Sequence, residues 1–416
     1  MSKIKTMPTS SDVRRLKGEI DAKKKFIASL PSENHPLRAN HQKTLGEKEM
    51  EYEMALEAQR RESVFRAYEE MNPPITEECP ICLETIKIYQ GGKSGSWCHA
   101  LCCGGGCCVD CFGESRRRGD IITKCPLCRE DYPRQSEQDK VMKLSKQRAE
   151  DGRSWAQAQM GMRYLMGRDG FPVNSAKALK WSKLSADQGD PDGMYCLAEV
   201  YAERGGESSL AKARSLMEEA ADLGSYQAQM RFGEMCSSGD DGPMDFTKAA
   251  KYLTLAYHQE PNPRIAFVLG SMFSSGRGLT KSLYRAKYYL QEALDKDDES
   301  LDKTCIYIPL AMTLSDLYGY QYEGTACSGH DCTPLIISYL RKAAIGGDTR
   351  AHGPLSILEG HKQQKCHNCC EKAAGKLKRC TRCKSVWYCD KTCQLEDWKA
   401  GHKIDCVEQV YYEIPK

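Results

Sequence analysis

A single pattern of small, aromatic and glycine residues recurs from residue 154 to about residue 360. Each copy has a run of small and apolar residues, a tyrosine, a glycine, a lysine–alanine pair, an aromatic residue, two small residues and a glycine. The lysine–alanine pairs lie at Lys177-Ala178, Lys212-Ala213 and Lys248-Ala249, 35 and then 36 residues apart. A period of this length is typical of stacked helix pairs, none of which buries its apolar face alone.

The positions within each copy predict how the two helices of a pair meet. Small residues let the backbones approach where the helices cross, the lysine–alanine pair opens the second helix, and glycine ends it. The pattern resembles the Sel-like repeats, relatives of the tetratricopeptide repeats, over residues 154–346. A degenerate fifth copy runs from about residue 301, with an insertion around residues 324–333. The resemblance implies a curved scaffold whose concave face holds proteins or peptides.

Aromatic and cysteine side chains inside the repeats are expected to be packing residues rather than a ligand cage. They are Tyr164, Trp181, Tyr201, Tyr252, Cys196, Cys236 and Cys305. In the insertion, Cys327, His330 and Cys332 offer three ligands of a metal site that lacks a fourth, so a plain loop is expected there.

A second constraint is the cysteine density between Cys79 and Arg129. The segment opens with Cys-Pro-Ile-Cys at Cys79 and closes with Cys-Pro-Leu-Cys at Cys128. Such pairs place two thiolates on one side of a tight turn, at the separation that tetrahedral Zn²⁺ requires. One zinc is saturated by four ligands, so a segment with several such pairs predicts two ions.

This segment resembles a RING finger, a family that interleaves its ligand pairs. The resemblance implies one zinc on Cys79, Cys82, Cys108 and Cys111. The second zinc takes four cysteines, which we assign as Cys102, Cys103, Cys125 and Cys128. The glycines at 104–106 permit the sharp turn that adjacent ligands need. Cys98 or His99 is the alternative in the middle pair, and Cys107 is interpreted as a spare.

Three residues in this segment are not needed for zinc binding. In ligase-type RING fingers, an apolar residue between the first two cysteines and a proline between the last two contact the ubiquitin-conjugating enzyme. An arginine after the last cysteine bridges that enzyme and ubiquitin. Ile81, Pro126 and Arg129 occupy these places. The resemblance therefore implies a RING-type ubiquitin-protein ligase, which orients another enzyme's thioester. The alternative is a non-enzymatic adaptor with structural zinc fingers.

A third constraint is the cysteine and histidine spacing between residues 366 and 406, which resembles a MYND finger over its full length. The resemblance implies one zinc on Cys366, Cys369, Cys389 and Cys393. It implies a second zinc on Cys380, Cys383, His402 and Cys406. MYND fingers are mostly peptide-binding modules, and in some relatives the counterparts of Gln394 and Trp398 contact proline-rich ligands.

Composition limits the partners and the compartment. The 416 residues carry 60 Lys and Arg against 57 Asp and Glu, so a net charge of +3 gives no reason to expect a nucleic-acid partner. The 23 cysteines cluster at metal spacing rather than as a disulfide framework. Neither a signal-peptide core nor a membrane-spanning apolar run is present in the sequence. We therefore expect a soluble intracellular protein of the cytoplasm or nucleus.

We expect a mainly α chain, an α/α solenoid of helix-pair repeats flanked by two small cross-braced zinc-binding domains, with four Zn²⁺ in all. The domains are a charged helical arm (1–72), a RING-type finger (73–131), a helical linker (132–153), the solenoid (154–360) and the MYND finger (366–406). The arm is either a coiled-coil or partner-binding helix or a solvated helix with few tertiary contacts. The expected partners are a ubiquitin-conjugating enzyme and protein substrates or peptides, including proline-rich ones.

Overall fold

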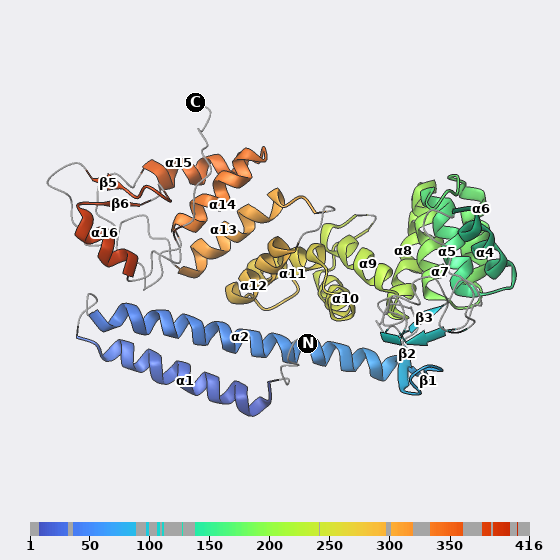
Figure 1. Ribbon diagram of the computed structural model, residues 1–416, viewed down its shortest axis with the longest axis horizontal. Coiled ribbons are helices and arrows are strands. Elements are labelled where there is room, and N and C mark those ends of the chain that lie inside the picture. The colour runs from blue at the N-terminus through green and yellow to red at the C-terminus, as the bar shows by residue number, and fades with distance from the viewer. Residues whose placement is uncertain are drawn as a thin grey trace. The chain divides into compact units, whose positions relative to one another are not determined.

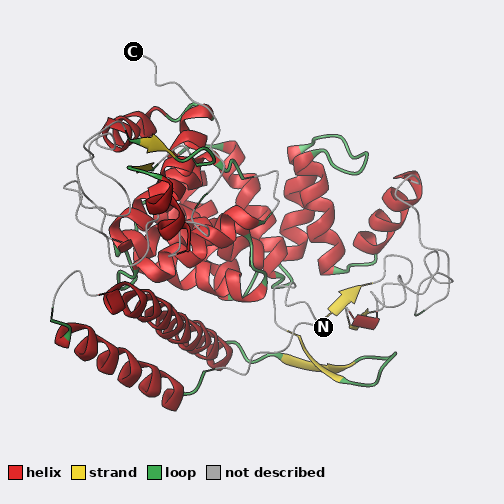
Figure 2. Cartoon of the chain, turned by 60° about the vertical axis from the view of Figure 1, so that its left-hand side comes forward, coloured by secondary structure: helices red, strands yellow, loops and turns green. Residues whose placement is uncertain are grey.

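The computed structural model describes residues 8–31, 36–88, 97–99, 106–108, 110–111, 127, 138–240, 242–296, 301–318, 333–360, 377–383, 386–399 and 406. The chain divides into two compact units. Unit 1 comprises Met1–Arg60 and Asn262–Lys416, and unit 2 comprises Arg61–Pro261. Helices dominate both units (Figure 1, Figure 2). No helix in the described ranges is both long and apolar enough to cross a bilayer.

Unit 2 holds the first three helix pairs and the short strands that precede them. The helices are α4 (Gln138–Glu150), α5 (Ser154–Met166), α6 (Ser175–Ala186), α7 (Pro191–Arg204), α8 (Glu207–Asp222), α9 (Tyr226–Ser238) and α10 (Phe246–Gln259). The strands form two antiparallel ribbons, β1 (Ile75–Glu78) with β2 (Thr85–Ile88) and β3 (Trp97–His99) with β4 (Gly106–Cys108).

Unit 1 holds the arm, the remaining helix pairs and the C-terminal finger. Its helices are α1 (Ser10–Ser29), α11 (Pro263–Ser275), α12 (Leu283–Asp295), α13 (Thr304–Tyr318), α14 (Thr333–Ile345), the 3-10 helix η1 (Thr349–Ala351), α15 (His352–Gly360) and α16 (Lys391–Asp397). One antiparallel ribbon pairs β5 (Lys378–Arg379) with β6 (Trp387–Tyr388). Helix α2 (Pro36–Met71) belongs to unit 1 up to Arg60 and to unit 2 from Arg61.

Helix starts and stops follow from the repeated pattern. The side chains of Asn174 and Asp245 accept hydrogen bonds from the backbone N–H groups of Lys177 and Lys248, each at 2.9 Å, so the lysine of the lysine–alanine pair lies in the capped first turn of α6 and α10. In the second repeat, the second helix, α8, begins at Glu207, before the lysine–alanine pair at Lys212. The first helices of three pairs end at left-handed glycines, Gly167, Gly239 and Gly276, with φ of 65°, 82° and 73°.

Helix-internal glycines allow the two helices of a pair to approach closely. A Cβ atom added at Gly161 would lie 2.5 Å from Ser182 Oγ. At Gly233 it would lie 2.6 Å from Leu253 Cγ. These distances are far below van der Waals contact, so the crossing geometry requires glycine, as the small residues in the pattern predict.

We expect Gly270→Ala in α11 to destabilise the fourth helix pair by about 1–3 kcal/mol, because the new methyl would lie 2.8 Å from Leu290 Cγ and force the helices apart. Hydrogen exchange across α11 and α12 measures this cost. Gly353→Ala in α15 is the matched control, since nothing lies within 4 Å of its added Cβ. Equal exchange in the two variants would contradict the close-approach account.

The degenerate fifth copy is a fifth helix pair, α13 and α14, in which Tyr307 stacks on Tyr339 with ring centroids 5.9 Å apart. Its insertion, with Cys327, His330 and Cys332, lies outside the described residues. The mainly helical solenoid is therefore confirmed. The predicted packing residues Tyr164, Trp181, Tyr252, Cys196 and Cys236 are buried, whereas Tyr201 and Cys305 are half-buried.

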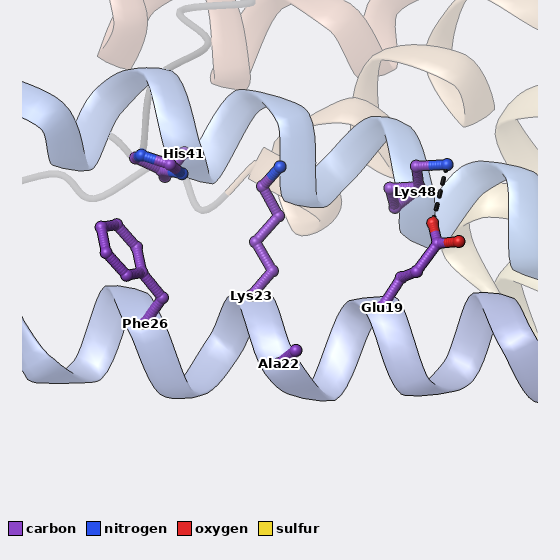
Figure 3. Close-up of a pocket in the computed structure, with 6 residues that line it drawn as sticks. All are labelled: Glu19, Ala22, Lys23, Phe26, His41 and Lys48. Carbon is purple, nitrogen blue, oxygen red and sulfur yellow. Dashed lines mark ion pairs between the residues drawn. The ribbon is translucent and has the colours of Figure 1, made fainter.

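The arm is an antiparallel helical hairpin. Helix α1 ends two residues before Pro31, and α2 begins at Pro36, where a proline is tolerated because the first helical residues lack intrahelical partners for their N–H groups. Ion pairs join the helices at Lys24–Glu49 (2.7 Å) and Lys48–Glu19 (2.9 Å). An open groove of about 400 Å³ lies between the two helices. Figure 3 shows its lining, Glu19, Ala22, Lys23 and Phe26 from α1 and His41 and Lys48 from α2.

Candidate metal centres

Three buried thiols gather at the C-terminal finger. Cys380 follows β5, Cys383 ends the turn after it, and the Sγ atoms of Cys380, Cys383 and Cys406 all lie within 4.8 Å of one another. The Sγ atoms of Cys380 and Cys406 are 3.9 Å apart. Two thiolates on one tetrahedral zinc lie about 3.8 Å apart, given Zn–S bonds of about 2.3 Å. The geometry of this cluster therefore fits zinc.

The surroundings of Cys380 favour its thiolate form. Burial raises the pKa of the Cys380 thiol, but hydrogen bonds from the backbone N–H groups of Cys383 and Arg382, together with the neighbouring thiols, outweigh it and bring the pKa below its ordinary value. Leu377, Val386 and Tyr388 are buried beside the sulfurs. A thiol with a lowered pKa beside a small apolar plug suits a structural zinc knuckle, because the thiolate is the form that binds the metal.

A second pair of thiols lies at the start of α16. Cys389 Sγ and Cys393 Sγ are 3.2 Å apart, and both residues are half-buried. Asp390 lies with them, but its carboxylate accepts the backbone N–H of Cys393 at 2.8 Å and so caps the helix. The structure thus brings together Cys389 with Cys393, and separately Cys380 with Cys383 and Cys406. Cys366, Cys369 and His402 lie outside the described residues.

The N-terminal cysteine segment forms a third cluster. The Sγ atoms of Cys79, Cys82 and Cys111 lie within 4.8 Å of one another. The turn between the first two is closed by hydrogen bonds from the Leu83 N–H to the Cys79 carbonyl (2.8 Å) and from the Cys79 N–H to the Glu84 carbonyl (2.9 Å). Leu83 adopts a left-handed φ of 61°. Because of this tight turn, the thiols of Cys79 and Cys82 both lie close to Cys111.

The residues around this cluster differ in how far they are buried. Ile81, between the paired cysteines, is 41% exposed. Cys107, interpreted from the sequence as a spare, is buried and packs against Cys79. Cys108 is the next residue of β4, but its side chain is not among those described. The other predicted residues outside the described part are Cys102, Cys103, Cys125, Pro126, Cys128 and Arg129.

Two family models match parts of this chain. The MYND finger model matches residues 366–406, and the Sel1 repeat model matches residues 156–190, 191–225, 227–260 and 266–298. The chain therefore contains a MYND finger and four Sel1 repeats, both protein–protein interaction modules, and it is a protein-interaction scaffold with a zinc finger. Neither match covers residues 79–129, where the RING assignment rests on the ligand pattern.

Curated relatives share only short stretches with the chain. Ubiquitin carboxyl-terminal hydrolase 19 of Arabidopsis thaliana is 57% identical over 37 residues, 9% of this chain and 5% of that protein. N-lysine methyltransferase SMYD2 of Rattus norvegicus is 40% identical over 56 residues, 14% of this chain and 12% of that protein. The chain thus spans a small fraction of the length of either relative.

Among solved structures, a Sel1 repeat protein from Oxalobacter formigenes is 18% identical with a TM-score of 0.41, covering 54% of this chain and 83% of that one. The protective antigen c5321 of uropathogenic Escherichia coli, which displays an SLR fold, is 23% identical with a TM-score of 0.41, covering 52% of this chain and 44% of that one.

Proposed function

We propose that this scaffold is a RING-type ubiquitin-protein ligase that recruits substrates through its Sel1 repeats and MYND finger. The observation that carries the proposal is the placement of Ile81, which is exposed on the knuckle between two gathered thiols. A single exposed apolar side chain is common on protein surfaces, but one held on a rigid turn is suited to anchor a partner, because little conformational freedom is lost on binding. A conjugating enzyme that docks on this knuckle covers Ile81.

The proposed zinc content is four ions per chain. In the MYND finger, Cys366, Cys369, Cys389 and Cys393 hold one zinc, and Cys380, Cys383, His402 and Cys406 hold the other. In the RING-type finger, Cys79, Cys82 and Cys111 hold one zinc with a fourth cysteine of β4, and the remaining ion takes Cys102, Cys103, Cys125 and Cys128. Each set saturates its zinc, so the metal is structural and leaves no open coordination position for catalysis.

A ligase of this kind supplies no nucleophile. It accelerates ubiquitin transfer by holding another enzyme's thioester beside the acceptor amine, so its contribution is proximity and orientation. Ubiquitin chain formation by the full chain with a panel of conjugating enzymes tests the proposal. If no enzyme in a broad panel gives chains, the non-enzymatic adaptor takes its place.

We expect Ile81→Ala to weaken binding of the conjugating enzyme by roughly tenfold to a hundredfold, because it removes an exposed apolar anchor worth about 1–3 kcal/mol. Titration by calorimetry with the conjugating enzyme most active in the panel measures the loss. Val173→Ala truncates a more exposed aliphatic side chain of the solenoid, 66% against 41% for Ile81, and is the control that should leave the affinity unchanged. An unchanged affinity in Ile81→Ala would remove the knuckle from the contact.

The proposed partner of the MYND finger is a short proline-containing peptide. Gln394 in α16 and Trp398, which caps it, lie four residues apart and therefore on one side of the helix. Both side chains are half-buried, so each offers part of its surface to a ligand. Trp398 would supply an apolar wall and Gln394 a polar contact. Trp398 also packs against the buried cluster of the finger.

A further inference from the structure

The fourth Sel1 repeat contacts α2 through hydroxyl groups. Three hydroxyls of α12 and its N-cap donate to three glutamates of α2. The pairs are Tyr284 Oη with Glu49 (2.7 Å), Ser282 Oγ with Glu53 (2.9 Å) and Tyr289 Oη with Glu57 (2.7 Å). Each glutamate therefore has its own donor on the repeat.

An arginine completes this face. Arg285 Nε lies 2.9 Å from a carboxylate oxygen of Glu53 and also donates to the Glu53 backbone carbonyl at 3.2 Å. Its Nη1 lies 3.6 Å from Glu57. The Glu57 side chain has no exposed surface, and Arg60 of α2 also pairs with it at 2.7 Å. The repeat thus places a nearly buried cation where two carboxylates of α2 meet.

The glutamates follow a simple spacing. Glu49, Glu53 and Glu57 stand four residues apart, so they lie along one face of the helix. Glu53, which accepts a hydrogen bond from the N-cap Ser282, also lies near the start of α12, where the helix dipole favours negative charge. The recognition surface is therefore complementary to any helix that carries carboxylates at positions i, i+4 and i+8.

The contact with α2 is polar, unlike the contacts within the solenoid. Among the described α2 side chains up to Arg60, Ala55 is the buried apolar one, whereas the fourth helix pair buries Phe273, Tyr289 and Leu290. Desolvation offsets much of the attraction in a buried ion pair, so such a contact adds little net stability compared with apolar packing. Helix α2 is accordingly an occupant that a competing helix can displace.

We infer that the α12 face formed by Ser282, Tyr284, Arg285 and Tyr289 is a docking site for an acidic helix, and that α2 is its intramolecular occupant. A partner protein that presents a helix with carboxylates at i, i+4 and i+8 competes with α2 for this face. Helix α2 therefore covers this face of the fourth repeat and blocks binding there until such a partner displaces it. The inference is independent of the proposed ubiquitin transfer.

A labelled peptide of residues 44–60 tests the inference in the full chain. The wild-type chain should bind it weakly, because the tethered α2 competes at an effective concentration of about millimolar. The full-chain variant Glu49→Gln/Glu53→Gln/Glu57→Gln weakens the tethered helix and leaves the repeat unchanged. Fluorescence anisotropy should show binding at least roughly tenfold tighter to this variant.

Two controls identify the binding face. A peptide with the same three glutamates replaced by glutamine should bind neither chain. Adding Arg285→Ala to the triple variant should abolish the gain. Equal binding of the acidic peptide to wild type and triple variant, or binding that Arg285→Ala does not reduce, would overturn the inference. Circular dichroism checks that each variant retains its helix content.

Hydrogen exchange provides a second test that needs only one mild substitution. Tyr284→Phe removes one hydroxyl that donates to Glu49, so exchange across residues 45–60 should accelerate several-fold. Tyr307→Phe, the same change on α13, is the matched control and should leave exchange in α2 unaltered. Identical exchange in α2 for both variants would show that the hydroxyl does not hold the arm, and would overturn the inference.

Discussion

Removal of zinc from the full chain should unfold the MYND finger while the Sel1 helices stay folded. In the described part of the finger, the buried cluster consists of Leu377, Val386 and Tyr388 with three cysteines that are proposed ligands. A segment of about 40 residues with so small an apolar core rarely folds without metal. Structural zinc supplies an apparent free energy of about 10–16 kcal/mol in comparable modules, so its loss exceeds any reserve of stability.

Hydrogen exchange before and after chelation measures this effect. Elemental analysis should first give four zinc ions per chain. After chelation, peptides across residues 377–399 should lose protection, while those across α11 and α12 keep it, because the repeats bury apolar side chains that need no metal. A finger that stays protected once the metal is gone, or a folded chain with two zinc ions or fewer, would refute the assignment of the ligand sets.

Arg285→Met should be the most damaging single substitution at the contact between α2 and the fourth repeat. It removes a cation that lies beside the buried carboxylate of Glu57, which keeps Arg60 and Tyr289 as partners. Breaking one side of a buried ion pair costs about 3–5 kcal/mol when the remaining charge has no other partner. Because Arg60 still pairs with Glu57 at 2.7 Å, we expect a smaller loss, about 2–3 kcal/mol. The opening free energy of α2 and α12, measured by hydrogen exchange, should fall by that amount.

The double variant Glu53→Leu/Arg285→Met is the control for this prediction, because Glu53 is the carboxylate that Arg285 pairs with at 2.9 Å. Replacing both members of a buried pair by apolar groups is often nearly neutral, so the double variant should recover most of the loss. A double-mutant cycle gives the coupling directly. A loss below about 1 kcal/mol in Arg285→Met, or a double variant as damaged as the single one, would contradict the buried-pair account.

The solenoid could be predicted from the sequence because its requirements are local and repeated. Glycine at 161 and 233 is required by helix pairs that adjoin in sequence, and Lys177 and Lys248 follow capping residues three positions earlier. Each copy has the same steric requirement for small residues where its helices cross, so the period can be recognised in the sequence alone. The fifth pair is harder to recognise because an insertion separates α13 from α14.

The contact between α2 and the repeats could not be predicted from the sequence. Its hydrogen bonds join residues 229 to 235 positions apart. The side chains that α2 contributes are charged, so in the sequence they resemble the surface of a solvated helix. Hydrophobic periodicity detects apolar faces and gives no signal here. The sequence does show the four-residue spacing of Glu49, Glu53 and Glu57. This spacing indicates a contact surface only once a complementary face is known.

In the cysteine segments, spacing identifies pairs better than it identifies single ligands. The Cys-x-x-Cys turns at Cys79 and Cys380 each gather their two thiols, because a tight turn fixes both side chains. Adjacent cysteines carry no such constraint. Cys107 and Cys108 are neighbours on β4, and the buried position of Cys107 beside Cys79 makes it a candidate for the fourth ligand, the place that the RING resemblance gives to Cys108.

Single-turnover discharge tests the proposed ligase most directly. A conjugating enzyme preloaded with ubiquitin is mixed with free lysine and the zinc-loaded full chain, and the decay of the thioester is followed. We predict that the wild-type chain accelerates discharge, that Ile81→Ala loses the acceleration through weaker binding, and that Arg129→Ala loses it while binding stays nearly intact. Discharge at the same rate with and without the wild-type chain, for every enzyme in the panel, would contradict the account and leave a non-enzymatic scaffold.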